Sequence, residues 1–215
     1  LNCAVIAITG SSGKTSTKDL LACVLSEFGD TIAPEGSFNT EVGVPLTILR
    51  ANADTRFLVL EMGMRGLGHI EYLCELSSPS IGVLLNIGSA HIGMLGSQKA
   101  IAQAKGELIE GLPSSGLAIL NGDDPFVREQ AVRTQARVVF FGESGTADVR
   151  ASDVDLDPMA RPKFTLHYGG QEAKVKLRVH GEHFVSNALA VASVALEIGL
   201  PLDEVAAALS KATIQ

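Results

Sequence analysis

A glycine-rich segment near the start of the chain constrains its fold more than any other feature. The apolar run Val5–Ile8 leads through Thr9 into Gly10-Ser11-Ser12-Gly13, which is followed by Lys14-Thr15-Ser16 and a predicted helix over residues 14–28. The two glycines allow the backbone to curl so that successive N–H groups point into one concavity. A strand, a glycine-rich turn and a helix in this order predict a phosphate-binding loop in an α/β fold.

The side chains of this loop indicate what it binds. Lys14 can reach the outer phosphates of a nucleoside triphosphate, and the Thr15 hydroxyl can ligate the Mg²⁺ ion that bridges them. Ile8 occupies the position of the first glycine in the usual G-x-x-x-x-G-K-[ST] pattern, and an ordinary Gly/Ser turn is the alternative interpretation. We expect the nucleotide to contact Gly10, Ser11, Ser12, Gly13, Lys14, Thr15 and Ser16.

The composition is typical of a soluble cytoplasmic enzyme. With 215 residues the chain is long enough for one large domain. Its hydrophobic residues, 46% of the total, form no uncharged run near the length of about 18 that a membrane span needs. The net charge of −7 argues against nucleic acid as the main partner, and the three cysteines have neither metal-ligand nor disulfide spacing. Because the chain begins with Leu1, we expect it to be part of a longer protein.

Predicted strands and helices alternate along most of the chain, as in a doubly wound, mostly parallel sheet. Toward the C-terminal end the pattern changes to three short, half-exposed strands, which we expect to be antiparallel strands appended to the sheet. The predicted strands after the first are Thr31–Ala33, Phe57–Met62, Ile81–Asn86, Leu117–Asn121, Val138–Phe141, Ala151–Leu156, Lys163–Tyr168 and Ala173–Val179. The predicted helices are Lys14–Phe28, Val42–Leu49, His69–Leu76, Gln98–Leu112 with Ser97 as its N-cap, Pro125–Thr134, His183–Ile198 and Leu202–Lys211.

Two polar residues follow predicted strands at the edge where α/β sheets bind ligands. Glu61 ends the apolar run Phe57–Leu60, where a carboxylate beside the phosphate loop can hold Mg²⁺ directly or through water. A strand that simply ends at the surface is the alternative. His91 lies five residues past the strand Ile81–Asn86, and its significance comes from sharing this edge with Glu61.

Lys105 falls in the middle of the apolar arc of its predicted helix, among Ile101, Leu108 and Leu112. A lysine on a core-facing stripe is costly unless it is paired, neutral or functional. Its amine would either extend past the core to water or take part in the reaction at the site. A desolvated amine can react with CO₂ to give a carbamate, which is an anionic oxygen ligand for Mg²⁺.

Several segments, taken together, resemble the Mur ligases, the ATP-dependent peptide ligases of peptidoglycan precursor synthesis. The matching segments, in the family's order, are Thr9–Asp19, Asn39–Thr47, Glu61–Gly66, Asn86–His91, Gly96-Ser97, Ala104–Glu107, Leu120–Asp124 and Gly181–Asn187. The resemblance covers essentially the whole chain. It implies that residues 1–215 form the family's central ATP-binding domain, with an N-terminal UDP-binding domain and a C-terminal domain outside the chain. Ser11-Ser12 and Glu61-Met62-Gly63 resemble the members that add D-alanyl-D-alanine.

The resemblance also implies a reaction. ATP would phosphorylate the C-terminal carboxylate of UDP-N-acetylmuramoyl-tripeptide, and the amine of D-alanyl-D-alanine would attack the acyl phosphate to form the peptide bond. Positive charge must be concentrated where the two anions meet. By resemblance, the catalytic residues are Lys14, His91 and Lys105. Thr15 and Glu61 would hold a first Mg²⁺, and His91 and a carbamylated Lys105 would position a second. Asn39 and Thr40 would face the UDP-muramoyl-peptide, and Asn187 would contact adenine.

Some features leave alternatives open. The family commonly has His-Asn where this chain has His183-Phe184, so either Phe184 stacks on adenine or the missing contact comes from elsewhere. Asp123 and Asp124 match a family loop near the nucleotide, but we interpret them as a helix cap before Pro125. We expect a monomer that is inactive without its flanking domains. The functional alternatives are another Mur-type amide ligase with a different acceptor and a non-catalytic nucleotide-binding module, although such a module would not need a second metal site.

Overall fold

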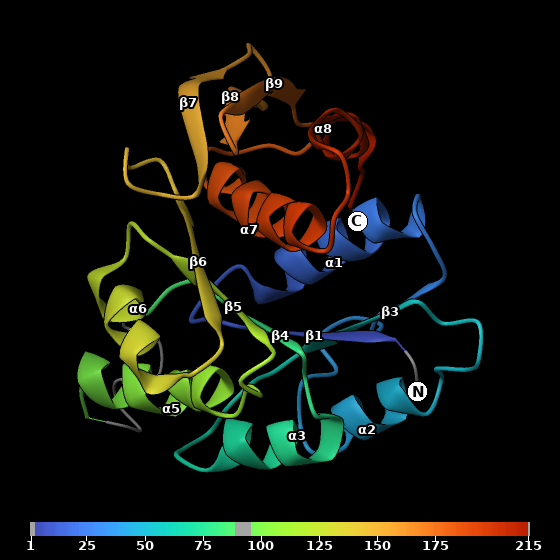
Figure 1. Ribbon diagram of the computed structural model, residues 1–215, viewed down its shortest axis with the longest axis vertical. Helices are drawn as coiled ribbons and strands as arrows, with labels where there is room; N and C mark the ends of the chain where they lie inside the picture. The colour runs from blue at the N-terminus through green and yellow to red at the C-terminus, as the bar shows by residue number, and fades with distance from the viewer. Residues whose placement is uncertain (1–2, 89–95, 215) are drawn as a thin grey trace.

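A nine-stranded sheet runs through the centre of the computed structural model, which describes residues 3–88 and 96–214 (Figure 1). Its strands are β1 (Ala4–Thr9), β2 (Thr31–Ile32), β3 (Phe57–Glu61), β4 (Ile81–Leu84), β5 (Leu117–Asn121), β6 (Arg137–Gly142), β7 (Val149–Leu156), β8 (Pro162–Tyr168) and β9 (Gln171–Lys176). Their order is β2-β3-β1-β4-β5-β6-β7-β8-β9. All pairings from β2 to β7 are parallel, which confirms the predicted, mostly parallel sheet.

Helices cover both faces of the parallel part of the sheet (Figure 1). They are α1 (Lys14–Ser26), α2 (Gly43–Ile48), α3 (His69–Ser77), α5 (Gln98–Glu110), α6 (Pro125–Arg128), the 3-10 helix η1 (Glu129–Arg133), α7 (Phe184–Glu197) and α8 (Leu202–Lys211). The core under α1, α7 and α8 includes Ile6 and Ile8, whereas Ala7 belongs to the core under α2, α3 and α5. Because successive residues of a strand point to opposite faces, a strand covered on both sides reads as a continuous apolar run.

The strand order reverses at β1, which lies between β3 and β4. The register pairs Ile8 with Glu61 of β3 and Thr9 with Leu84 of β4, so the carboxyl ends of these three strands lie level at one edge. Ligands of open α/β sheets bind at the carboxyl ends of strands next to such a switch point. The segments that follow β1, β3 and β4 are therefore the place to look for a site.

The C-terminal strands β7, β8 and β9 extend the sheet beyond β6 at one edge. β7 pairs antiparallel with β8, and β8 with β9. Gly169-Gly170, with φ of 57° and 80°, makes the tight turn between β8 and β9. These pairings confirm the predicted antiparallel strands at the C-terminal end. On its other side β7 pairs in parallel with β6, where Val149 and Arg150 lie opposite Phe141 and Gly142. The chain keeps its direction through residues 143–148 and reverses only after β7.

Several predicted boundaries also differ. The predicted helix Pro125–Thr134 is broken into α6 and η1, and the last predicted strand begins at Gln171 rather than Ala173 and ends at Lys176. The predicted cap of α5 is confirmed, because the Ser97 hydroxyl accepts from the Ala100 N–H at 3.2 Å. Among the described residues, the structure has no helix with the length and apolar character that a membrane crossing requires.

Candidate active site

The glycine-rich loop between β1 and α1 has the conformation that an anion site requires. Gly13 adopts a left-handed φ of 78°, which favours glycine, and a Cβ at this position would lie 2.9 Å from Asn187 Oδ1, so the Asn187 side chain would have to shift. Gly13 is also the N-cap of α1 and supplies no capping side chain. The first N–H groups of α1 therefore remain available to an anion at the positive end of the helix.

Asn86, which follows β4, fixes the shape of this loop. Its backbone carbonyl accepts from the Ser11 N–H at 3.0 Å, and its side-chain oxygen accepts from the Ser12 N–H at 2.9 Å. Its amide group donates back to the Ser12 carbonyl at 3.2 Å. Sequence reasoning gave Asn86 no individual role, although an asparagine just after a predicted strand at the ligand edge was an available signal.

Glu61 lies under the loop and is 1% exposed, which excludes a strand end at the surface. One carboxylate oxygen accepts from the Thr15 hydroxyl at 3.0 Å, and the other accepts from Asn39 Nδ2 at 2.7 Å. Three residues that are distant in the sequence are thereby joined. The Asn39 carbonyl in turn accepts from the Gly63 N–H at 2.8 Å, so the segment before α2 is tied to the end of β3.

Two lysines converge on one carbonyl of the loop. Lys14 Nζ and Lys105 Nζ each donate to the Gly10 oxygen at 3.0 Å. Lys105 is 1% exposed, so the alternative that it extends to water is excluded. Burial and, secondarily, repulsion by the Lys14 ammonium lower the pKa of Lys105 to about 8. Burial also lowers the pKa of Lys14, which the Glu61 carboxylate opposes in part.

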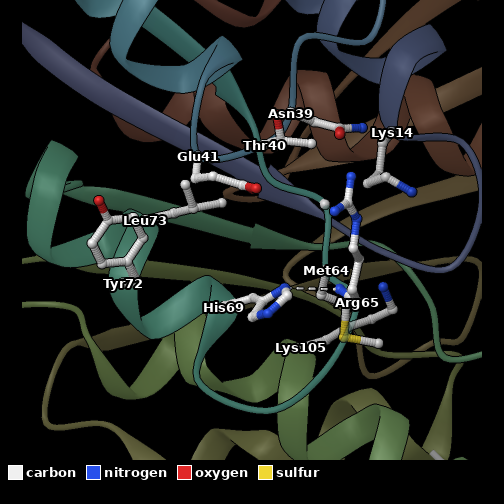
Figure 2. Close-up of a pocket in the computed structure, with 11 residues that line it drawn as sticks. Lys14, Asn39, Thr40, Glu41, Met64, Arg65, His69, Tyr72, Leu73 and Lys105 are labelled. Carbon is white, nitrogen blue, oxygen red and sulfur yellow. Dashed lines mark hydrogen bonds between the residues drawn. The ribbon is translucent and has the colours of Figure 1, made fainter. Parts of the chain in front are cut away.

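A cavity of about 650 Å³ opens beside these lysines. Figure 2 shows Lys14, Arg65 and Lys105 together on one side of it, with Tyr72 and Leu73 on the other. The Arg65 N–H donates to His69 Nδ1 at 3.1 Å, which fixes the orientation of that imidazole. The full lining is Lys14, Asn39, Thr40, Glu41, Gly63, Met64, Arg65, His69, Tyr72, Leu73 and Lys105. The sequence analysis gave no site role to the wall residues after β3, although Gly63, Met64 and Arg65 lie in the family-like segment Glu61–Gly66.

The remaining predicted residues fall into different groups. His91 lies outside the described residues. Ser16 belongs to the first turn of α1, and Asn187, at 6% exposed, reaches the phosphate loop from α7. Phe184 packs against His183 with ring centroids 4.6 Å apart.

The two aspartates predicted to cap a helix behave differently. Asp124 accepts from the Phe126 and Val127 N–H groups as the predicted cap, and also from Ile87 N–H. Asp123 does not cap the helix, because its carboxylate accepts from Glu143 and Ser144 N–H in a neighbouring loop.

The residues present fit a nucleotide with Mg²⁺. A hydroxyl and a carboxylate 3.0 Å apart, Thr15 and Glu61, are the oxygen donors that Mg²⁺ prefers, with phosphates and water completing its shell. Ser11 Oγ and Asn187 Nδ2 are buried beside the loop with no hydrogen-bond partner among the described residues, so each is free for a ligand. Within residues 3–88 and 96–214, there is no group of three or more His, Cys, Asp or Glu side chains that could hold a metal ion. Mg²⁺ at Thr15 and Glu61 would therefore need the phosphates and water as further ligands.

The switch-point location, the glycine-rich loop and its lysine define this chain as a P-loop nucleotide-binding domain of the doubly wound α/β class. Residues 8–195 match the family described as the Mur ligase middle domain. The chain therefore belongs to the Mur ligase family.

Two curated relatives of this chain carry the same name. The chain is 53% identical over 208 residues to UDP-N-acetylmuramoyl-tripeptide--D-alanyl-D-alanine ligase of Mycobacterium tuberculosis (strain ATCC 25618 / H37Rv), covering 97% of this chain and 41% of that protein. It is 35% identical to the protein of that name from Escherichia coli (strain K12), covering 96% and 46%.

Two solved structures resemble this fold closely. MurF from Acinetobacter baumannii superposes with a TM-score of 0.93 at 34% identity, covering 100% of this chain and 47% of that one. MurF ligase from Thermotoga maritima in complex with ADP superposes with a TM-score of 0.87 at 30% identity, covering 99% and 49%. The chain thus spans less than half the length of each of these four proteins.

Proposed function

We propose that this chain is the central ATP-binding domain of a ligase that adds D-alanyl-D-alanine to UDP-N-acetylmuramoyl-tripeptide in peptidoglycan precursor synthesis. The observation that carries the proposal is the convergence of Lys14 and Lys105 on the Gly10 oxygen at a cavity whose wall includes Asn39 and Thr40. Glu61 joins Thr15 of the phosphate loop to Asn39 of this wall. The relatives named above support the proposal. Because the chain spans less than half of their length, an N-terminal UDP-binding domain and a C-terminal domain outside residues 1–215 are part of the proposal.

The proposed reaction requires two anions to approach each other. An oxygen of the tripeptide carboxylate attacks the γ-phosphorus of ATP and ADP leaves; the amine of D-alanyl-D-alanine then attacks the acyl carbon, and phosphate leaves. Lys14 neutralises the outer phosphates, and the N–H groups of residues 10–16 hold them. Bound Mg²⁺ would supply further positive charge for this approach. Thr15 and Glu61 would hold one ion, and His91 and Lys105 a second.

Lys105 suits the role of a carbamate better than that of a permanent cation. Carbamylation joins a neutral amine to CO₂ through a new N–C bond and releases a proton. A pKa of about 8 leaves a larger neutral fraction near neutral pH than an ordinary lysine has. The product would place negative oxygens next to Lys14 and relieve the repulsion between the two ammonium groups.

The peptide and the base of the nucleotide have separate candidate contacts. Asn39 and Thr40 line the cavity from the segment before α2, where they would face the UDP-muramoyl-peptide. Asn187, whose Nδ2 lacks a partner among the described residues, would contact adenine. The alternatives, a ligase with another acceptor and a non-catalytic nucleotide-binding module, differ from this proposal in what they do with the peptide rather than with ATP.

Calorimetric titration with MgATP tests the nucleotide part of the proposal. We expect the chain to bind MgATP more tightly than MgGTP and Lys14→Ala to lose at least tenfold in affinity; Lys99→Ala, an exposed lysine on α5, is the matched control. If the chain alone gives no signal, the titration is repeated on the full-length protein. An absence of ATP binding there too would refute the proposal.

A further inference from the structure

Lys18 is a buried lysine on α1 that the proposed reaction does not use. It lies one helical turn after Lys14, and it is 1% exposed. Its ammonium donates to the carbonyl oxygens of Pro34 and Gly36, each at 2.9 Å, and lies 2.6 Å from the Asp19 carboxylate. An ammonium has three donors, so these three contacts satisfy it fully. Such a complete set is needed to keep a lysine charged in the interior.

The two carbonyls belong to the segment between β2 and α2, residues 33–42, which we call the wall loop. This loop carries Asn39, Thr40 and Glu41 into the lining of the cavity. Lys18 holds its first half through Pro34 and Gly36. Its second half is held at Asn39, which contacts Glu61 through its amide and Gly63 through its carbonyl.

Helix α1 therefore reaches the wall loop by two routes. Lys18 contacts the loop directly, and Thr15 reaches it through Glu61, which accepts from both Thr15 and Asn39. The second route consists of the same oxygen atoms that would hold Mg²⁺. If Thr15 and Glu61 held Mg²⁺, their oxygen atoms would ligate the cation in place of their mutual hydrogen bond. The Lys18 route uses none of these atoms and persists.

We propose that Lys18 is a positioning residue that keeps the wall loop aligned with the phosphate-binding helix while Thr15 and Glu61 hold Mg²⁺. Asn39 and Thr40 then stay at a fixed place relative to Lys14, which the transfer between two bound anions requires. This inference rests on the proposed function and adds to it the element that coordinates the nucleotide half of the site with the peptide half.

Amide exchange in this chain tests the link without any activity measurement. The Gly63 N–H donates to the wall loop at Asn39 and reports on its docking, whereas Val59, in the middle of β3, reports on the stability of the sheet. In Lys18→Met, which removes the ammonium group and keeps an unbranched side chain one atom shorter, we expect Gly63 to exchange at least tenfold faster relative to Val59. MgADP should widen this difference, because it engages the second route.

The control is Ser193→Ala, which removes a buried 2.7 Å hydrogen bond in α7 far along the chain from the wall loop. It should leave the ratio of Gly63 to Val59 exchange unchanged. If Lys18→Met does not fold, Lys18→Gln, which has the same length as methionine but ends in a polar amide, replaces it. Equal acceleration of Gly63 and Val59, or no widening with MgADP, would show that Lys18 is merely structural and would overturn the proposal.

Kinetics of the full-length ligase separate positioning from stability. Lys18→Met should raise the KM for the UDP-peptide at least tenfold and leave the KM for ATP within twofold. Lys18→Arg, which keeps the donors, should restore much of the loss. Asp19→Asn, which keeps an acceptor, should stay near wild type. Equal increases in both KM values would contradict the proposal. If wild-type enzyme does not turn over this peptide, the proposed function fails, while the exchange result stands by itself.

Discussion

Lys105 is the residue whose replacement should separate stability from function most clearly. Its pKa of about 8, against an ordinary 10.5, means that the folded chain carries an unfavourable charge at pH 7. At about 1.36 kcal/mol per pKa unit, the cost of this charge is about 3 kcal/mol. Lys105→Met removes the cost together with one hydrogen bond, worth about 1 kcal/mol. The Gly10 oxygen is not left unpaired, because Lys14 also donates to it at 3.0 Å.

We therefore expect Lys105→Met to raise the free energy of unfolding at pH 7 by about 2 kcal/mol and to abolish ligation by the full-length enzyme. Urea denaturation in Mg²⁺-free, CO₂-depleted buffer measures the first effect. Lys99→Met, on the exposed side of the same helix, is the control and should change stability by less than about 0.5 kcal/mol.

The pH dependence gives a second test with a definite sign. Between pH 8 and pH 10.5 the unfolded chain still binds the Lys105 proton whereas the folded chain has released it, so wild-type stability gains a contribution that rises with pH. The advantage of Lys105→Met should shrink across this window. A variant less stable than wild type at pH 7, or an advantage that does not change with pH, would refute the reasoning.

Two further replacements and one labelling experiment test other parts of the account. Gly13→Ala places a side chain at a left-handed φ and against Asn187. It should lower the free energy of unfolding, measured by urea denaturation, by about 1–2 kcal/mol and weaken MgADP binding at least tenfold. Wild-type affinity for MgADP would contradict this expectation. Glu107 accepts from the N–H groups of Gly68 and Glu71 and thereby caps α3 from α5. Glu107→Ala should lower the free energy of unfolding by about 1 kcal/mol and speed amide exchange at the start of α3. Unchanged exchange would argue against the cap. Burial raises the pKa of Cys74 to about 12, so iodoacetamide at pH 8 should modify it only after denaturation, as mass spectrometry would show; rapid labelling of the folded chain would disprove this.

The sequence predicted those site residues whose positions follow from the order of neighbouring strands, turns and helices. A glycine-rich turn must lie between the strand and the helix that flank it, and Glu61, at the end of a neighbouring buried strand, must lie near that turn. Lys105 was marked by its place on an apolar helix face, where only a buried and partnered amine is tolerable. In each case a short-range pattern determines the position of one residue relative to the sheet.

The sequence was less informative where long-range contacts decide. The hydrogen bonds of Asn86 to Ser12 and of Lys18 to Pro34 join segments whose distance depends on how loops return to the sheet. The parallel pairing of β7 with β6 was not predicted, because a half-exposed strand has the same alternation of polar and apolar residues in either orientation. The cavity wall around His69 likewise depends on the packing of α3 on α5.

Phosphate release by the full-length protein tests the central claim most directly. The enzyme is incubated with MgATP, UDP-N-acetylmuramoyl-tripeptide and one acceptor at a time: D-alanyl-D-alanine, D-alanine or another amino acid. The account predicts phosphate release, with formation of the pentapeptide product, only when the tripeptide and D-alanyl-D-alanine are both present, and its loss in Lys14→Ala. No release with this pair, or equal release with a single amino acid, would contradict it.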